Sequence, residues 1–171
     1  MSPTNRNTIT EFGVRGWLCD SAVTAEGKLY VQGGGWNLLS PPVFPAQLPR
    51  IGIAICVDVP YTATNQTHTL TITLQGEDGQ LLGLGPVLND PTDPAGIPKP
   101  GQIEAQFNLG RPPGLMAGDA QPVPFALNID GYMLASPGAY AFVVSIDGTE
   151  MERLIFRAVP AMPMGMPGGI R

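Results

Sequence analysis

The sequence predicts an all-β fold, an antiparallel β-sandwich of two sheets built from about eight or nine strands, with a closed barrel as the alternative. Large apolar residues recur at every second position in several segments, which is the spacing of a strand with one buried face. Asp-Gly pairs follow two of these segments, where a tight hairpin turn is expected. Gly (22) and Pro (19) are abundant among the 171 residues, and both are disfavoured inside helices.

Two short strands are expected near the N-terminus, at residues 14–19 and 28–32, joined through Ala25-Glu26-Gly27. The clearest strand follows at residues 51–59, where isoleucine and valine occupy every second position. We expect this large apolar face to fill the core. The opposite face is small, which predicts close packing against another part of the chain; its residues are Gly52, Ala54, Cys56 and Asp58.

The middle of the chain combines a hairpin with two long connections. Residues 68–75 alternate apolar residues with threonine, and Asp78-Gly79 predicts a turn into a returning strand at 80–84. Residues 85–101 and 109–124 are rich in proline, so we expect long loops there. Loops of this length within a compact domain are usually functional or disordered.

The C-terminal third predicts three more strands. They occupy residues 125–129, 140–146 and 153–159, and Asp147-Gly148 turns between the last two. Strands from both halves of the chain then share one core. Its expected members are Ile53, Ile55, Val57, Leu70, Ile72, Phe142 and Val144.

The segment Ser-Pro-Gly-Ala-Tyr at residues 136–140 refines the fold class and completes the domain organisation. It looks like the corner of immunoglobulin-like sandwiches, in which a tyrosine at the start of a strand anchors a loop. We therefore expect an N-terminal arm (1–13), one immunoglobulin-like sandwich domain (14–159) and an apolar tail (160–171). The tail cannot bury its side chains as a helix or strand. We expect it either to be a frayed end or to bind a partner through Met162, Met164, Met166 and Ile170.

Charge and hydropathy exclude several classes of partner. The net charge is −5, from 9 basic and 14 acidic residues, and the basic residues form no cluster. Binding to nucleic acid or to an anionic membrane surface is therefore not expected. The N-terminus lacks a signal-peptide pattern, and no segment reaches the ~20 apolar residues of a membrane span. We expect a cytoplasmic protein, or a virion protein if a phage encodes it.

Catalytic residues are not apparent in the sequence. His68 is the only histidine, it lies on the apolar side of its strand, and no serine lies in a nucleophile-elbow pattern. We expect His68 to bond a carbonyl at a strand end. Cys19 and Cys56 are expected to be reduced and buried. A disulfide between them requires that their strands be adjacent or facing.

Metal and ligand sites have weak signals. One His and two separated Cys do not supply a zinc site, and we expect no cofactor. Asn89, Asp90 and Asp93 lie in one loop that leaves calcium binding open. Gly33-Gly34-Gly35 lacks the lysine and helix of a phosphate loop, so a bulge or strand break is expected. A sugar-stacking platform would use the aromatic residues Trp17, Tyr30, Trp36 and Tyr61.

One longer pattern is more specific. It consists of Leu18-Cys19-Asp20-Ser21-Ala22, then Gly27-Lys28-Leu29-Tyr30-Val31, then Gly34-Gly35-Trp36. This opening resembles that of a family of small β-sandwich proteins of unknown function, found in bacteria, notably actinobacteria, and encoded by phages. The resemblance extends over most of residues 14–159. It implies a β-sandwich and no established activity, so it assigns no functional residue.

Together these features predict a non-catalytic protein-interaction or structural module. A repeated component of a larger assembly is the most concrete form, for example a protein that decorates or cements a phage capsid. The partner would be another protein or a second copy of the chain. A sandwich that binds carbohydrate or another small ligand is the first alternative, and an enzyme of unrecognised type is the second.

Overall fold

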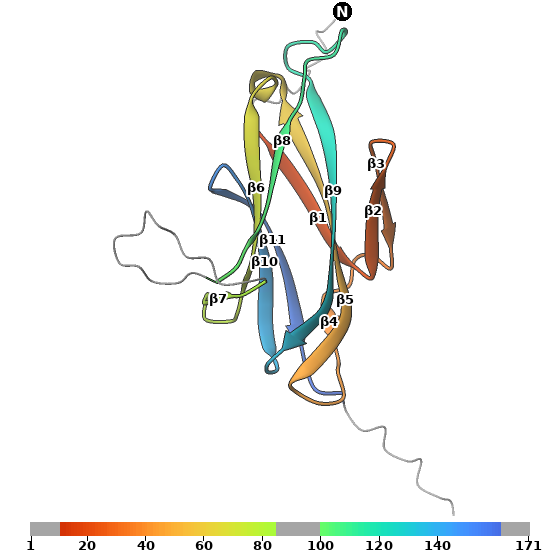
Figure 1. Ribbon diagram of the computed structural model, residues 1–171, viewed down its shortest axis with the longest axis vertical. Coiled ribbons are helices and arrows are strands. Elements are labelled where there is room, and N and C mark those ends of the chain that lie inside the picture. Colours follow the sequence, from red (N-terminus) through yellow and green to blue (C-terminus); the bar gives the residue numbers. More distant parts are fainter. Residues whose placement is uncertain (1–10, 85–99, 162–171) are drawn as a thin grey trace, which may run out of the picture.

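The computed structural model describes residues 11–84 and 100–161 of the chain. Strands dominate these ranges, in which the only helix is a 3₁₀ turn at Tyr61–Ala63. No helix in these ranges has the length and apolar character needed to cross a bilayer. The fold is all-β, as the alternating pattern predicts (Figure 1). The strands are β1 (Gly13–Cys19), β2 (Ser21–Ala25), β3 (Lys28–Gln32), β4 (Leu38–Leu39), β5 (Ala46–Pro60), β6 (Thr67–Gln75), β7 (Leu81–Leu82), β8 (Ile103–Asn108), β9 (Ala120–Leu134), β10 (Gly138–Ile146) and β11 (Thr149–Ala158).

The strands form two larger sheets and a separate hairpin. A three-stranded antiparallel sheet has the order β1-β5-β9. A six-stranded sheet has the order β4-β11-β10-β6-β7, and β8 pairs with the part of β6 that β7 leaves open. β2 and β3 pair with each other as a two-stranded sheet. In Figure 1 this hairpin lies on the side of the three-stranded sheet that faces away from β6, β10 and β11.

One hydrophobic core joins the two larger sheets. Every second residue of β5 from Ile51 to Val59 is at most 1 % exposed, and the equivalent faces of β6 and β10 complete the cluster. The predicted core is confirmed, because each of its members is 2 % exposed or less. These members are Ile53, Ile55, Val57, Leu70, Ile72, Phe142 and Val144.

The expected hairpin between the first two strands is wrong. β1 pairs with β5, and the partner of β3 is β2, a strand not predicted from the sequence. The turn between β2 and β3 consists of Glu26 and Gly27, both with positive φ. β2 has five mostly small residues and no extended apolar alternation, so its pattern alone does not mark it as a strand.

The strand number and direction also differ from the prediction. Eleven strands are present among the described residues, and β4 runs parallel to β11 rather than antiparallel. β4 and β7 have two residues each, too few for a detectable period. β8 does alternate, with Ile103 and Phe107 against Glu104 and Asn108. This strand, between the two proline-rich stretches, could therefore have been predicted from the sequence.

The second proline-rich stretch is only partly a loop. Its last residues, from Ala120, belong to β9, which is an edge strand of the three-stranded sheet. Pro122 and Pro124 lie opposite Asp58 and Cys56 of β5. Proline has no N–H to donate, so it is accommodated on an edge strand, where it also discourages pairing with another chain.

Candidate interaction surface

The β2–β3 hairpin is attached to the outer face of the three-stranded sheet by one amide side chain. Asn128 of β9 accepts a hydrogen bond from the Ala22 N–H through Oδ1 at 3.0 Å. Its Nδ2 donates to the Ala22 carbonyl oxygen at 2.8 Å. The amide therefore satisfies both backbone groups of Ala22, which is 2 % exposed.

Small residues allow the hairpin to approach the sheet closely. Cys19, Ala22 and Ala54 form a second buried cluster, against which Leu29 and Ala126 pack. A Cβ at Gly52 would lie 2.7 Å from the Cys19 Sγ and 2.8 Å from the Cys19 carbonyl oxygen. The prediction that the small face of residues 51–59 packs closely is confirmed here, since Gly52 and Ala54 are buried under the hairpin.

A groove opens where the hairpin leaves the sheet. Its floor comes from β1 and β5, its wall comes from β3 and the residues after it, and its volume is about 450 Å³. Arg15 forms an ion pair of 3.0 Å with Asp58 on the same sheet face. Both side chains are partly exposed, so this pair contributes little to stability. The groove is lined by Arg15, Trp17, Leu29, Val31, Gly34 and Cys56.

Large apolar side chains are exposed around this groove and on the other face of the hairpin. Trp17 and Val31 are each 42 % exposed, Tyr30 is 52 % exposed and Val23 is 54 % exposed. Val23 and Tyr30 are direct cross-strand partners. We call these four residues the hairpin surface. Exposed apolar residues gathered in one region of the surface, away from the core, are typical of an interaction site.

The two cysteines lie on adjacent strands but do not pair. Cys19 is opposite Gly52 and Cys56 is opposite Arg15, which separates the two positions by four residues along the sheet. At about 3.3 Å per residue this distance is too long for a disulfide. Both thiols are free, as expected, although only Cys19 is fully buried. Burial, with a smaller effect of the neighbouring Asp20 charge, raises the pKa of the Cys19 thiol.

The four aromatic residues considered for sugar stacking do not form one platform. Trp17 and Tyr30 belong to the hairpin surface. Trp36 packs edge-on against Phe156 in the core, with ring centroids 6.0 Å apart. Tyr61 lies under the guanidinium of Arg111, whose Cζ is 3.8 Å from the centroid of the Tyr61 ring.

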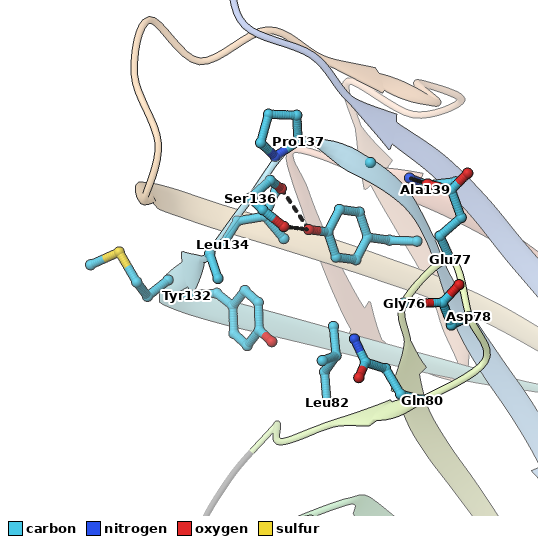
Figure 2. Close-up of a pocket in the computed structure, with 14 residues that line it drawn as sticks. Gly76, Glu77, Asp78, Gln80, Leu82, Tyr132, Leu134, Ser136, Pro137 and Ala139 are labelled. Atoms are coloured by element: carbon cyan, nitrogen blue, oxygen red, sulfur yellow. Dashed lines mark hydrogen bonds between the residues drawn. The ribbon is translucent and has the colours of Figure 1, made fainter.

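A second cavity, of about 300 Å³, lies at the predicted tyrosine corner. The Tyr140 hydroxyl donates to the Ser136 carbonyl oxygen at 2.6 Å, so the expected loop anchor is confirmed. Figure 2 shows Ser136 on one side of this cavity and Tyr132, Gln80 and Leu82 on the other. Burial raises the pKa of the Tyr132 hydroxyl, and the nearby Tyr140 adds to the effect. We attribute the cavity to the architecture of the corner.

His68 is held by two partners at the end of β6. Its Nε2 lies 2.8 Å from the Ala63 carbonyl oxygen, which confirms the expected bond to a carbonyl. Its Nδ1 lies 2.7 Å from Oδ2 of Asp147, and the ring is buried. Burial lowers the pKa of His68, but the bonds to Asp147 and Ala63 and the Asp147 charge outweigh it, so the pKa is raised above 6.5. The bond to His68 lowers the pKa of Asp147 below 3.8.

We expect this pair to stabilise the fold most between about pH 4 and pH 6.5. A raised histidine pKa adds stability that is complete below the unfolded-state value and is lost as pH rises through the folded-state value. Urea unfolding of the wild type and of His68→Gln should therefore show a larger difference at about pH 5 than at about pH 8. A difference that does not change with pH would contradict a charged His68 in the folded protein.

Some predicted sites fall outside the described residues. These are the tail residues Met162, Met164, Met166 and Ile170, and the loop residues Asn89, Asp90 and Asp93. Within residues 11–84 and 100–161, no group of three or more His, Cys, Asp or Glu side chains could hold a metal ion.

Two features of the surface were not anticipated from sequence. Asn128 is a polar residue in the middle of an apolar strand, between Leu127 and Ile129. This position could have indicated that its side chain has a specific hydrogen-bond partner. Val23 carried no signal, because its exposure depends on how β2 docks.

The fold and the surface define an all-β domain that carries a rigidly docked hairpin with exposed apolar side chains. The chain belongs to DUF6941, a family of unknown function whose model matches residues 16–159. The expected membership of an uncharacterised family is thus confirmed. No curated protein matches the chain.

The similarity to a solved structure is weak. The structure is that of the alkylpurine DNA glycosylase AlkC of Pseudomonas fluorescens, bound to DNA containing an abasic site analog, and it is one of several that match. The similarity covers 86 % of this chain and 30 % of that chain, with a TM-score of 0.43 and 11 % sequence identity. This chain therefore spans less than a third of the glycosylase chain, and a similarity of this level carries no argument about function.

Proposed function

We propose that the chain is a non-catalytic protein-interaction module with an immunoglobulin-like sandwich fold, used as a repeated component of a larger assembly. A phage particle whose shell it decorates is one concrete case. The observation that carries the proposal is the hairpin surface, Trp17, Val23, Tyr30 and Val31, each at least 42 % exposed. Such aromatic and aliphatic side chains are the usual anchors of protein interfaces.

The manner in which the hairpin is held supports this role. Asn128 bonds both backbone groups of Ala22, and Leu29 packs into the cluster beneath. The apolar side chains are thus presented by a supported element, so binding a partner would cost little ordering entropy. Outside the hairpin, the shared core of the two sheets and the Tyr140 corner support the immunoglobulin-like assignment.

The surroundings of His68 support a non-catalytic reading. Both ring nitrogens are already engaged, one with Asp147 and one with the Ala63 carbonyl. A general base needs a free nitrogen directed at the nucleophile or the substrate. Asp147 instead joins the turn after β10 to the start of β6. Its carboxylate contacts His68 and also accepts a hydrogen bond from the Thr69 N–H at 2.8 Å.

The proposal is tested by the native size of the protein in its source cells. The tagged wild type is expected to elute from a mild lysate well above the size of one chain, and Trp17→Ser with Val23→Ser should elute at a smaller size. Ile155→Ser is the matched control, because Ile155 is 60 % exposed on β11 and lies outside the hairpin surface. Elution of the wild type as a single chain would contradict the proposal, provided that the melting temperatures of all variants agree.

A small apolar ligand is the second candidate, favoured by the groove of about 450 Å³ and the exposed Trp17 in its floor. The intrinsic fluorescence of Trp17 separates the two candidates. A sugar or apolar compound that binds the isolated chain should shift the Trp emission, and Trp17→Phe should abolish the shift. Binding to proteins alone, with no response across a glycan panel, would eliminate this candidate.

A further inference from the structure

The β2–β3 hairpin has two edges, and the turn determines which backbone groups lie on them. Glu26 and Gly27 have φ of 51° and 70°, the positive values of a type I′ turn. The flanking residues Ala25 and Lys28 face each other directly, and the pair that closes a two-residue turn of this type exchanges hydrogen bonds. In an antiparallel ladder such pairs alternate with pairs whose N–H and C=O groups point away from the partner strand.

This alternation directs the backbone groups of Ala22 on β2, and of Leu29 and Val31 on β3, to the outer edges. The bonds between Ala22 and Asn128 agree with it, because they reach the outward N–H and C=O of Ala22. At Ala22 the β2 edge is thus closed by a side chain. Within the described part of the chain, the outward groups of Leu29 and Val31 have no hydrogen-bond partner.

The β3 edge lacks the protection seen on three other edges of this fold. β9 carries Pro122 and Pro124, and the edge strands β4 and β7 are only two residues long. β3 has five residues, no proline and one charge, Lys28 at its start. An exposed edge of this kind is a template for pairing with another strand.

We propose that the β3 edge pairs with the β3 edge of a second copy of this chain, antiparallel and about a two-fold axis at Tyr30. Leu29 then lies opposite Val31 of the second copy, and each exchanges N–H···O=C bonds with the other. The two hairpins form one four-stranded sheet. This inference rests on the proposed protein-interaction function and names the partner of the hairpin surface.

The side chains of β3 are self-complementary in this register. Tyr30 faces Tyr30 of the second copy in a non-hydrogen-bonded pair, whose Cα atoms are about 4.5 Å apart. Aromatic pairs at such positions stabilise a sheet. Lys28 lies opposite Gln32 of the second copy, so no like charges meet. On the other face, Leu29 and Val31 extend the apolar wall of the Trp17 groove.

Proline variants separate this edge from the rest of the hairpin. Val31→Pro removes an outward N–H and leaves the bonds to β2 in place. Thr24→Pro is the matched control, because Thr24 pairs with Leu29 and its N–H points outward on the β2 edge. In sedimentation equilibrium the purified wild type and Thr24→Pro should both dimerise reversibly. Val31→Pro should raise the dimer dissociation constant at least about tenfold.

Cross-linking provides a second measurement that does not depend on proline. Tyr30→Cys places two thiols across the axis at a separation suited to a disulfide. Under mild oxidation it should form a covalent dimer, and Thr24→Cys should not. Three results would each overturn this inference. The wild type could sediment as a monomer at all concentrations, Val31→Pro could dimerise as tightly as the wild type, or Tyr30→Cys could fail to cross-link the dimer. The proposed function has its own readout, the size of the native complex in source cells, so the two can fail separately.

Discussion

Ile55→Ala is expected to lower the free energy of unfolding by about 2–5 kcal/mol. Ile55 lies in the middle of β5, the central strand of its sheet, and is 1 % exposed. Its side chain belongs to the cluster that joins the two larger sheets, so truncation leaves a cavity that neither sheet can close alone. Equilibrium denaturation in urea measures the loss.

Ile155→Ala is the control for this prediction. The residue type is the same, but Ile155 on β11 is 60 % exposed. Its truncation should change the free energy of unfolding by no more than about 0.5 kcal/mol. Equal losses at the two positions would show that the shared core between the sheets is described incorrectly.

Asn128→Leu is expected to destabilise the protein by about 1–3 kcal/mol and to loosen the hairpin. The substitution keeps the approximate size of the side chain but leaves the Ala22 N–H and C=O without their partner. The loss of stability should therefore be concentrated in the hairpin, at residues 21–32. Hydrogen–deuterium exchange is expected to accelerate there and to remain unchanged in β6 and β10.

Asp130→Ala is the matched control on the same strand. Asp130 pairs with Arg50 at 2.6 Å, but their side chains are 61 % and 47 % exposed. An exposed ion pair contributes little, so the hairpin should exchange as in the wild type. If Asn128→Leu leaves exchange at residues 21–32 unaltered, the amide does not hold the hairpin.

Local patterns in the sequence predicted the parts of this fold that depend on one strand at a time. The alternation at residues 51–59, 68–75 and 140–146 marked the buried faces of β5, β6 and β10, because the period of two is a property of any half-buried strand. The Tyr140 anchor was also predictable, since the residues that it joins are only four positions apart.

The sequence by itself determined an all-β chain, seven members of its core and the small face of β5. Only the tertiary structure decided which strands pair, that β4 runs parallel to β11, and where the hairpin docks. The candidate surface belongs to this second group. Trp17 and Val31 line one groove because Asn128 holds Ala22 across 106 positions of the chain. A contact between residues so far apart leaves no periodic trace in the sequence, since it depends on how the sheets pack.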